Sequence, residues 1–394
     1  MYNAIRYPAS FFDLAYPCLT FVFYSGIVYI WILPIIHFLV IFHTSDFISA
    51  NTGFNIIYYI TMKYNIYNDL LNIKNKEDLY NKKVNIITND NIDLSHYIFS
   101  KLPDQKKDIL LKHLSKYKFK TKTHILIDID DTIYPGSSGG TNVSYKTKEI
   151  YPFLMILLNL FIEKSCTSNF VTILTARPRF LRKNVINHFN KIFTDFKFDV
   201  LPGKIKHLSE GVGDFIDKYF ISYVKKTRNK NINTNVSDQN LIPYYKKMAL
   251  RKYESYKKYS LLFPEFEFIF IGDSGQGDIN TSISMMTNNT NVKLCFIHNI
   301  TQVKKKQIFK KYKESNFRFN IYSKSIKNRL KSKNILFFDT YLDVFKILYD
   351  KKYMNDSNKK IMKTEIKKYM NISHDKFISP ILYNRFIESI SNYS

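Results

Sequence analysis

Three apolar runs in this chain each end abruptly in polar residues, and this pattern limits the folds that the chain can adopt. The runs cover residues 124–127, 170–174 and 266–271 and are rich in Ile, Val, Leu and Phe. Such short apolar runs predict buried strands. Helical patterns follow or separate them, at residues 148–162, 180–192, 246–262 and 279–286. This alternation predicts an α/β fold with a parallel sheet and right-handed crossovers.

The residues that close these runs are of the types that bind phosphate or metal. Asp128 and Asp130 follow the first run, Thr175 follows the second, and Asp273 follows the third, with Asp278 shortly after it. Ligands of open α/β sheets gather at the carboxyl ends of the strands, so these side chains are expected to meet at one site. The alternative for any one of them is a strand end with solvated acids.

Two carboxylates separated by one residue suit a metal-dependent phosphoryl transfer. One carboxylate, at Asp128 or Asp130, can attack phosphorus while the other handles the proton of the leaving group, and both lie near one cation. Thr175 can hold a phosphoryl oxygen. The glycines beside Asp273 allow the loop to approach a metal or a phosphate closely.

Together these motifs resemble the haloacid dehalogenase superfamily of phosphatases, whose pattern is Asp-x-Asp-x-Thr, then Thr or Ser, a Lys, and Gly-Asp with a further Asp. The chain is still more similar to the phosphatidate phosphatases of the actin-patch protein type, over residues 123–351. The segments that carry this similarity are Asp128–Thr132, Tyr151-Pro152, Leu201–Gly203, Phe263-Pro264, Gly272–Gln276 and Phe337–Tyr341. The second motif departs from that family, because Thr175–Pro178 replaces a Ser-Asn-Ser-Pro-like sequence. This departure leaves phosphatase chemistry intact but weakens the argument for a lipid substrate.

The resemblance implies a role for each carboxylate. Asp128 is the implied nucleophile, which forms an aspartyl-phosphate, and Asp130 protonates the leaving alkoxide and then activates water. The implied cofactor is Mg²⁺, a hard cation held by Asp128, the backbone carbonyl of Asp130 and Asp273. Asp278 is implied to orient a water ligand or Lys252.

The resemblance also implies that Lys252 and Thr175 neutralise and hold the transferring phosphoryl oxygens. Lys252 is chosen by its spacing to Phe263-Pro264, and Lys246 and Lys247 compete with it.

Two neighbouring residues have no assigned chemistry. Asp131 is expected to cap the loop. Arg177 can contact a headgroup phosphate through its planar fork, but an exposed loop arginine is the more common outcome.

The amino terminus carries the second major signal. From Leu14 to Ser45 the chain has no Asp, Glu, Lys or Arg, and this stretch is long enough to cross a bilayer with tilt. Pro17 and Pro34 also permit a broken or hairpin insertion. A buried core helix and a cleavable signal peptide are the alternatives.

Composition restricts the partners. A net charge of +26 usually suggests a protein that binds nucleic acid. Here the lysines are accompanied by many Asn, Ile and Tyr residues, a composition that AT-rich coding also produces. No known nucleic-acid-binding motif is present in the sequence. We therefore expect no specific nucleic-acid partner, whereas a basic surface is compatible with an anionic membrane. Cys18, Cys166 and Cys295 show no metal spacing and imply no disulfide scaffold.

The expected organisation has four regions. These are a membrane-anchoring segment at 1–45, a small amino-terminal module at 46–120, a three-layer, Rossmann-like (HAD-like) phosphatase domain at 121–352, and a basic tail at 353–394. Little chain is left for a cap between Asp130 and Thr175. An open site of this kind suits a substrate that a surface presents.

The sequence thus predicts a membrane-associated, Mg²⁺-dependent phosphatase that hydrolyses phosphatidate to diacylglycerol and phosphate. The first alternative is the same chemistry on a phosphoprotein or a soluble phosphomonoester. The second is a catalytically silent membrane adaptor, which would have no need of Asp128, Asp130, Thr175 and Asp273 together.

Overall fold

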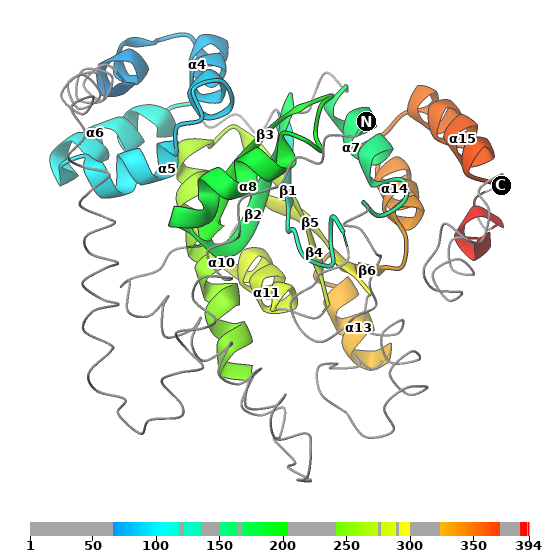
Figure 1. The fold of residues 1–394 in the computed structure, drawn as a ribbon. Coiled ribbons are helices and arrows are strands. Elements are labelled where there is room, and N and C mark those ends of the chain that lie inside the picture. Colours follow the sequence, from blue (N-terminus) through cyan, green and yellow to red (C-terminus); the bar gives the residue numbers. More distant parts are fainter. Residues whose placement is uncertain are drawn as a thin grey trace, which may run out of the picture. The chain divides into compact units, whose positions relative to one another are not determined.

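A computed structural model describes parts of both halves of the chain. The described residues are 66–117, 122–134, 150–163, 168–203, 242–274, 277–288, 291–299, 324–370, 387–391 and 393. The chain forms two compact units, Met1–Asn72 and Ile73–Ser394. In the first unit residues 66–72 are helical, and the second unit contains the sheet (Figure 1).

Within the described residues, six strands form one parallel sheet in the order β3-β2-β1-β4-β5-β6 (Figure 1). The strands are β1 Lys122–Ile127, β2 Phe170–Pro178, β3 Lys197–Gly203, β4 Phe266–Asp273, β5 Val292–His298 and β6 Ile335–Phe338. The predicted α/β fold with a parallel sheet is therefore confirmed, and it has the order of a Rossmann-like core. The strand order reverses between β1 and β4, which is where such sheets bind ligands.

Helices connect the strands close to the predicted positions. Their bounds are α4 Lys76–Thr88, α5 Leu94–His96, η1 Tyr97–Lys101, α6 Asp104–Ser115, α7 Leu154–Ile162, η2 Arg179–Leu181, α8 Arg182–Phe189, α10 Ile242–Leu262, α11 Asp278–Asn288, α13 Lys324–Lys331, α14 Tyr341–Asp350 and α15 Asp356–Met370. The predicted helix at 180–192 is divided, because its first turn is the 3₁₀ turn η2 and the α-helix starts only at Arg182.

The core explains why the strands read as continuous apolar runs. Ile125 and Ile127 of β1 join the apolar cluster that α7, α8 and α14 contribute to on one face. Because side chains alternate along a strand, His124 and Leu126 lie on the opposite face. On that side α10 contacts β2 and β3, and α11 contacts β4 and β5. Strands covered on both faces are apolar at most positions.

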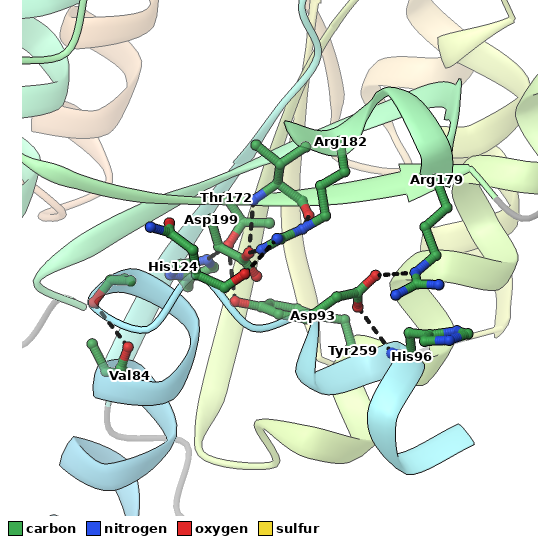
Figure 2. A network of polar contacts seen from close by, with 12 residues as sticks. Val84, Asp93, His96, His124, Thr172, Arg179, Arg182, Asp199 and Tyr259 are labelled. Atoms are coloured by element: carbon green, nitrogen blue, oxygen red, sulfur yellow. Dashed lines mark hydrogen bonds and ion pairs between the residues drawn. The ribbon is translucent and has the colours of Figure 1, made fainter. Parts of the chain in front are cut away.

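Hydrogen bonds and ion pairs connect the segment that precedes β1 with the sheet (Figure 2). The Arg182 guanidinium donates to the carbonyls of Val200 at 2.9 Å and Asn91 at 2.8 Å, and to the Asp199 carboxylate at 3.0 Å. Asp93 accepts from the backbone N–H of His96, which caps α5. These contacts join the loop before α5 to β3.

His124 belongs to the same region (Figure 2). Its ring is fully buried and stacks on Phe266, and its Nε2 lies 2.8 Å from the Thr172 hydroxyl, which in turn lies 2.8 Å from the Tyr259 hydroxyl. The structure thus gives His124 a role in packing. Cys295 is a buried free thiol in β5.

Several predictions fall on other parts of the chain. The apolar stretch from Leu14 to Ser45, Cys18, Cys166 and the predicted insertion at 225–239 all lie outside the described residues. Across the part that the structure describes, no helix combines the length and apolar character needed to cross a bilayer.

Candidate active site

The predicted site residues lie at one edge of the sheet. β1 is hydrogen-bonded to β2 on one side and to β4 on the other. Asp128 directly follows β1, Thr175 lies in the last part of β2, and Asp273 ends β4. Since the three strands are parallel, their carboxyl ends share this edge, at the point where the strand order reverses.

Three carboxylates form the centre of the site. One oxygen from each of Asp128, Asp273 and Asp278 lies within 4.8 Å of the other two, and all three residues are buried. Carboxylate oxygens at this separation can hold a metal ion. The structure thereby brings together three of the four residues for which the sequence predicts metal binding.

One ammonium group lies among these carboxylates. Lys252 is buried, and its Nζ is 2.7 Å from Asp128 Oδ1 and 2.5 Å from Asp278 Oδ1. Its competitors Lys246 and Lys247 are exposed. Lys252 extends from the middle of α10 and is therefore the one of these three lysines that lies in the site.

Burial and charge set the protonation of these groups. Burial raises the pKa of Asp128 to about 7, although the Lys252 ammonium opposes the shift. Burial and the neighbouring Asp278 raise the pKa of Asp273 well above its ordinary value. Burial lowers the pKa of Lys252, but the carboxylates of Asp128 and Asp278 outweigh this and the pKa is raised. Lys252 thus contributes one positive charge beside three buried carboxylates, and a bound divalent cation would balance remaining negative charge.

The start of α11 positions the third carboxylate. Asp278 is the first residue of that helix, and its Oδ2 accepts a hydrogen bond from the backbone N–H of Asp273 at 3.2 Å. The approach requires a glycine at 272, since a Cβ there would lie 2.7 Å from the Cβ of Asp278. The Gly-Asp motif is thus explained by close packing between β4 and α11.

Asp130 lies at a more open position of the site. Its side chain is 18% exposed, and both of its oxygens accept from Nη2 of Arg177, at 3.0 and 2.9 Å. The expected exposed loop arginine is wrong for Arg177, which is only partly exposed and is paired with a predicted catalytic residue. Its position two residues after Thr175, at a strand end, was the signal that could have indicated this contact.

The loop after β1 is held from two other elements. Asp131 has a positive φ of 62°, which Asp tolerates better than most residues. Its carbonyl oxygen accepts from His298 Nδ1 at 2.8 Å, and the carbonyl of Thr132 accepts from the Tyr341 hydroxyl at 2.6 Å. Sequence reasoning did not assign these contacts to His298 and Tyr341, because they join residues far apart in the chain.

Comparisons with protein-family models, with curated proteins and with solved structures give no match to this chain. The fold and the site therefore define its class on their own. The chain is an α/β protein with a six-stranded parallel sheet and a buried acidic triad that can hold a metal ion at the carboxyl edge of that sheet.

Proposed function

We propose that this chain is a Mg²⁺-dependent phosphatase of the haloacid dehalogenase type, which acts through an aspartyl-phosphate on Asp128. The observation that carries the proposal is the cluster at the β1 and β4 ends, where Lys252 bridges Asp128 and Asp278 beside Asp273. Burying a lysine and two carboxylates costs desolvation free energy. Clusters of buried ionisable groups of this kind are concentrated at functional sites.

The donor set fits Mg²⁺. Its members are carboxylate oxygens, the ligands that a hard cation prefers. Asp128, Asp273 and the backbone carbonyl of Asp130 would hold the ion, and Asp278 lies beside them. When bound, Mg²⁺ would neutralise charge on the phosphoryl oxygens.

The protein side chains account for the bonds that form and break. An oxygen of Asp128 attacks phosphorus, the bond from phosphorus to the leaving oxygen breaks, and Asp130 gives its proton to that oxygen. In the second step Asp130 takes a proton from water, and the water oxygen attacks phosphorus. The bond from phosphorus to Asp128 then breaks and inorganic phosphate leaves.

Lys252 and Thr175 have supporting roles in this scheme. Lys252 contacts Oδ1 of Asp128, which leaves Oδ2 to act as the nucleophile. Thr175 Oγ1 accepts from the backbone N–H of Arg177 at 3.2 Å, so its own hydroxyl hydrogen can be donated to a phosphoryl oxygen. The positive charge and this donor would stabilise the transition state.

We propose phosphatidate as the substrate and a membrane as the working surface. The short connection between the first two motifs, the net charge of +26 and the apolar stretch from Leu14 to Ser45, as a single span or a hairpin, support this choice. The Thr175–Pro178 sequence favours a second candidate, a phosphoprotein or soluble phosphomonoester, because it departs from the lipid phosphatase pattern.

A substrate panel tests both candidates. We expect the purified protein to release phosphate from phosphatidate in mixed micelles faster than from phosphopeptides or sugar phosphates, to lose this activity on chelation, and to regain it with Mg²⁺. Faster release from a peptide or sugar phosphate would replace the lipid by the second candidate. If no substrate releases phosphate, the proposal that the protein is an enzyme is wrong, and a catalytically silent adaptor is favoured.

A further inference from the structure

Arg177 makes two contacts at the site, and the scheme above uses only the one to Thr175. Its guanidinium nitrogen Nη2 lies 3.0 and 2.9 Å from the two oxygens of Asp130. Its backbone N–H donates to Oγ1 of Thr175. One residue at the end of β2 therefore contacts a carboxylate after β1 and a hydroxyl within β2.

The pair of Arg177 and Asp130 differs from an ordinary surface ion pair. The two side chains are 33% and 18% exposed, so they lie at the boundary between solvent and the buried carboxylates. Partial burial strengthens such a charged hydrogen bond relative to a fully solvated pair. Because both oxygens face the same nitrogen, rotation of the Asp130 carboxyl group is restricted.

We infer that Arg177 is a positioning residue that fixes the Asp130 side chain beside Asp128, so that a proton can be delivered to the leaving group. The inference rests on the proposed function. Without the guanidinium, the Asp130 side chain can rotate toward solvent. It would then lie within hydrogen-bond distance of the leaving oxygen for a smaller fraction of the time, and proton transfer would be less efficient.

This role makes the effect of Arg177 depend on the leaving group. An alkyl phosphate expels a strongly basic alkoxide, which needs a proton, whereas p-nitrophenyl phosphate expels a nitrophenolate that leaves without one. A residue that merely stabilised the fold would affect both substrates equally. The quantity to compare is kcat/KM, because it reports the steps up to formation of the aspartyl-phosphate.

The test compares Arg177→Gln, Arg177→Lys and the wild type of the full chain on the two substrates. For Arg177→Gln we expect kcat/KM to fall ~10- to 100-fold more on the alkyl phosphate than on p-nitrophenyl phosphate, a part of the ~10²- to 10⁴-fold that general acid catalysis provides. Arg177→Lys should recover part of this loss, because an ammonium can contact one carboxylate oxygen.

Arg179→Gln is the matched control. Arg179 lies two residues further along the chain and also forms an ion pair, but its partner is Asp93, at 3.0 Å. This variant should leave the ratio of the two kcat/KM values unchanged. An equal fall on both substrates for Arg177→Gln, or an equal change of the ratio in Arg179→Gln, would overturn the positioning role.

The contact itself can be observed without turnover. In ¹⁵N spectra of arginine side chains, a guanidinium held by Asp130 should show resolved Nη signals that collapse in Asp130→Asn. Collapsed signals in the wild type would refute the restraint. A wild type with resolved Arg177 signals and no phosphate release would instead contradict the proposed function, so the two failures can be told apart.

Discussion

Asp273 is one of the three buried carboxylates that can hold a metal ion. It is fully buried, and burial together with Asp278 raises its pKa. The ammonium of Lys252 contacts Asp128 and Asp278. A divalent ion bound at Asp273 would therefore relieve its electrostatic repulsion with Asp278.

We expect MgCl₂ to raise the melting temperature of the protein and a chelator to reverse the rise. Binding to the folded state alone stabilises it by about 2.7 kcal/mol when the ion is at 100 times its Kd. Asp273→Asn should need a higher Mg²⁺ concentration for the same rise. Asp339→Asn, which alters an acid that follows β6, should behave like the wild type. A melting temperature that does not respond to Mg²⁺ would contradict the metal site.

At the residue scale, the sequence predicted the members of the site better than their contacts. Asp128 and Asp273 could be predicted because strand ends of a parallel sheet converge, and this rule needs only local sequence. Asp278 could be predicted because it follows Asp273 closely in the chain. The contact between Arg177 and Asp130 joins residues 47 positions apart. The position of Arg177 near the end of β2 indicates that it lies close to the site, but local sequence could not identify a partner so distant in the chain.

At the element scale, the close approach of β4 and α11 supports the site. Gly272→Ala would place a Cβ 2.7 Å from the Cβ of Asp278, so the start of α11 must move. We expect a loss of about 1–3 kcal/mol in the free energy of unfolding, as for other overpacked positions. The melting temperature should also become less sensitive to Mg²⁺. A variant with unchanged stability and metal response would show that the contact is not needed.

The buried histidine of β1 gives a pH dependence. Burial holds the pKa of His124 well below its usual 6.5. Below that pH the unfolded chain binds a proton that the folded chain does not, so this contribution to stability is present above pH 6.5 and is lost as the pH falls. Lowering the pH from about 6.5 to about 5.5 should reduce the difference in unfolding free energy between the wild type and His124→Gln by about 1 kcal/mol.

Urea unfolding of both proteins across this pH range measures the effect. The comparison removes contributions that the two proteins share, including those of Asp128 and Asp273. Their raised pKa values have the opposite effect, because the folded chain then binds the additional protons. A difference in unfolding free energy that does not change with pH would mean that His124 titrates normally in the folded protein.

Strand β3 is an element that the sequence pattern did not predict. The sequence pattern indicated the Leu201–Gly203 motif but no strand, because β3 contains Asp199 and Pro202. Asp199 is buried against Arg182, a tertiary contact that the strand pattern does not reveal. β3 is at the edge of the sheet, where a proline that cannot donate a hydrogen bond is tolerated.

At the scale of the whole molecule, the proposed role of the amino-terminal apolar stretch is to hold the protein at the surface that contains its proposed substrate. Phosphatidate resides in a bilayer, and a catalytic domain anchored there meets it at a high local concentration. Deleting residues 1–45 should move the protein from the membrane fraction to the soluble fraction. Its rate on phosphatidate vesicles should fall, and added salt should deepen the loss. Its rate on a water-soluble phosphomonoester should change little, since no site residue is removed.

Fractionation and vesicle assays test this anchor. A truncated protein that still sediments with membranes after a high-salt wash would contradict it. Equal activity of the truncated and full-length chains on vesicle phosphatidate would do the same.

The central claim is that Asp128 carries the phosphoryl group, and chemical trapping tests it most directly. Borohydride reduces an acyl phosphate to an alcohol, so the wild type quenched during turnover should contain homoserine at position 128 when its peptides are analysed by mass spectrometry. Asp128→Asn should remain folded, show no such product, and release phosphate at least ~10³-fold more slowly. Phosphate release with an unmodified Asp128, or near-normal release by Asp128→Asn, would contradict the account.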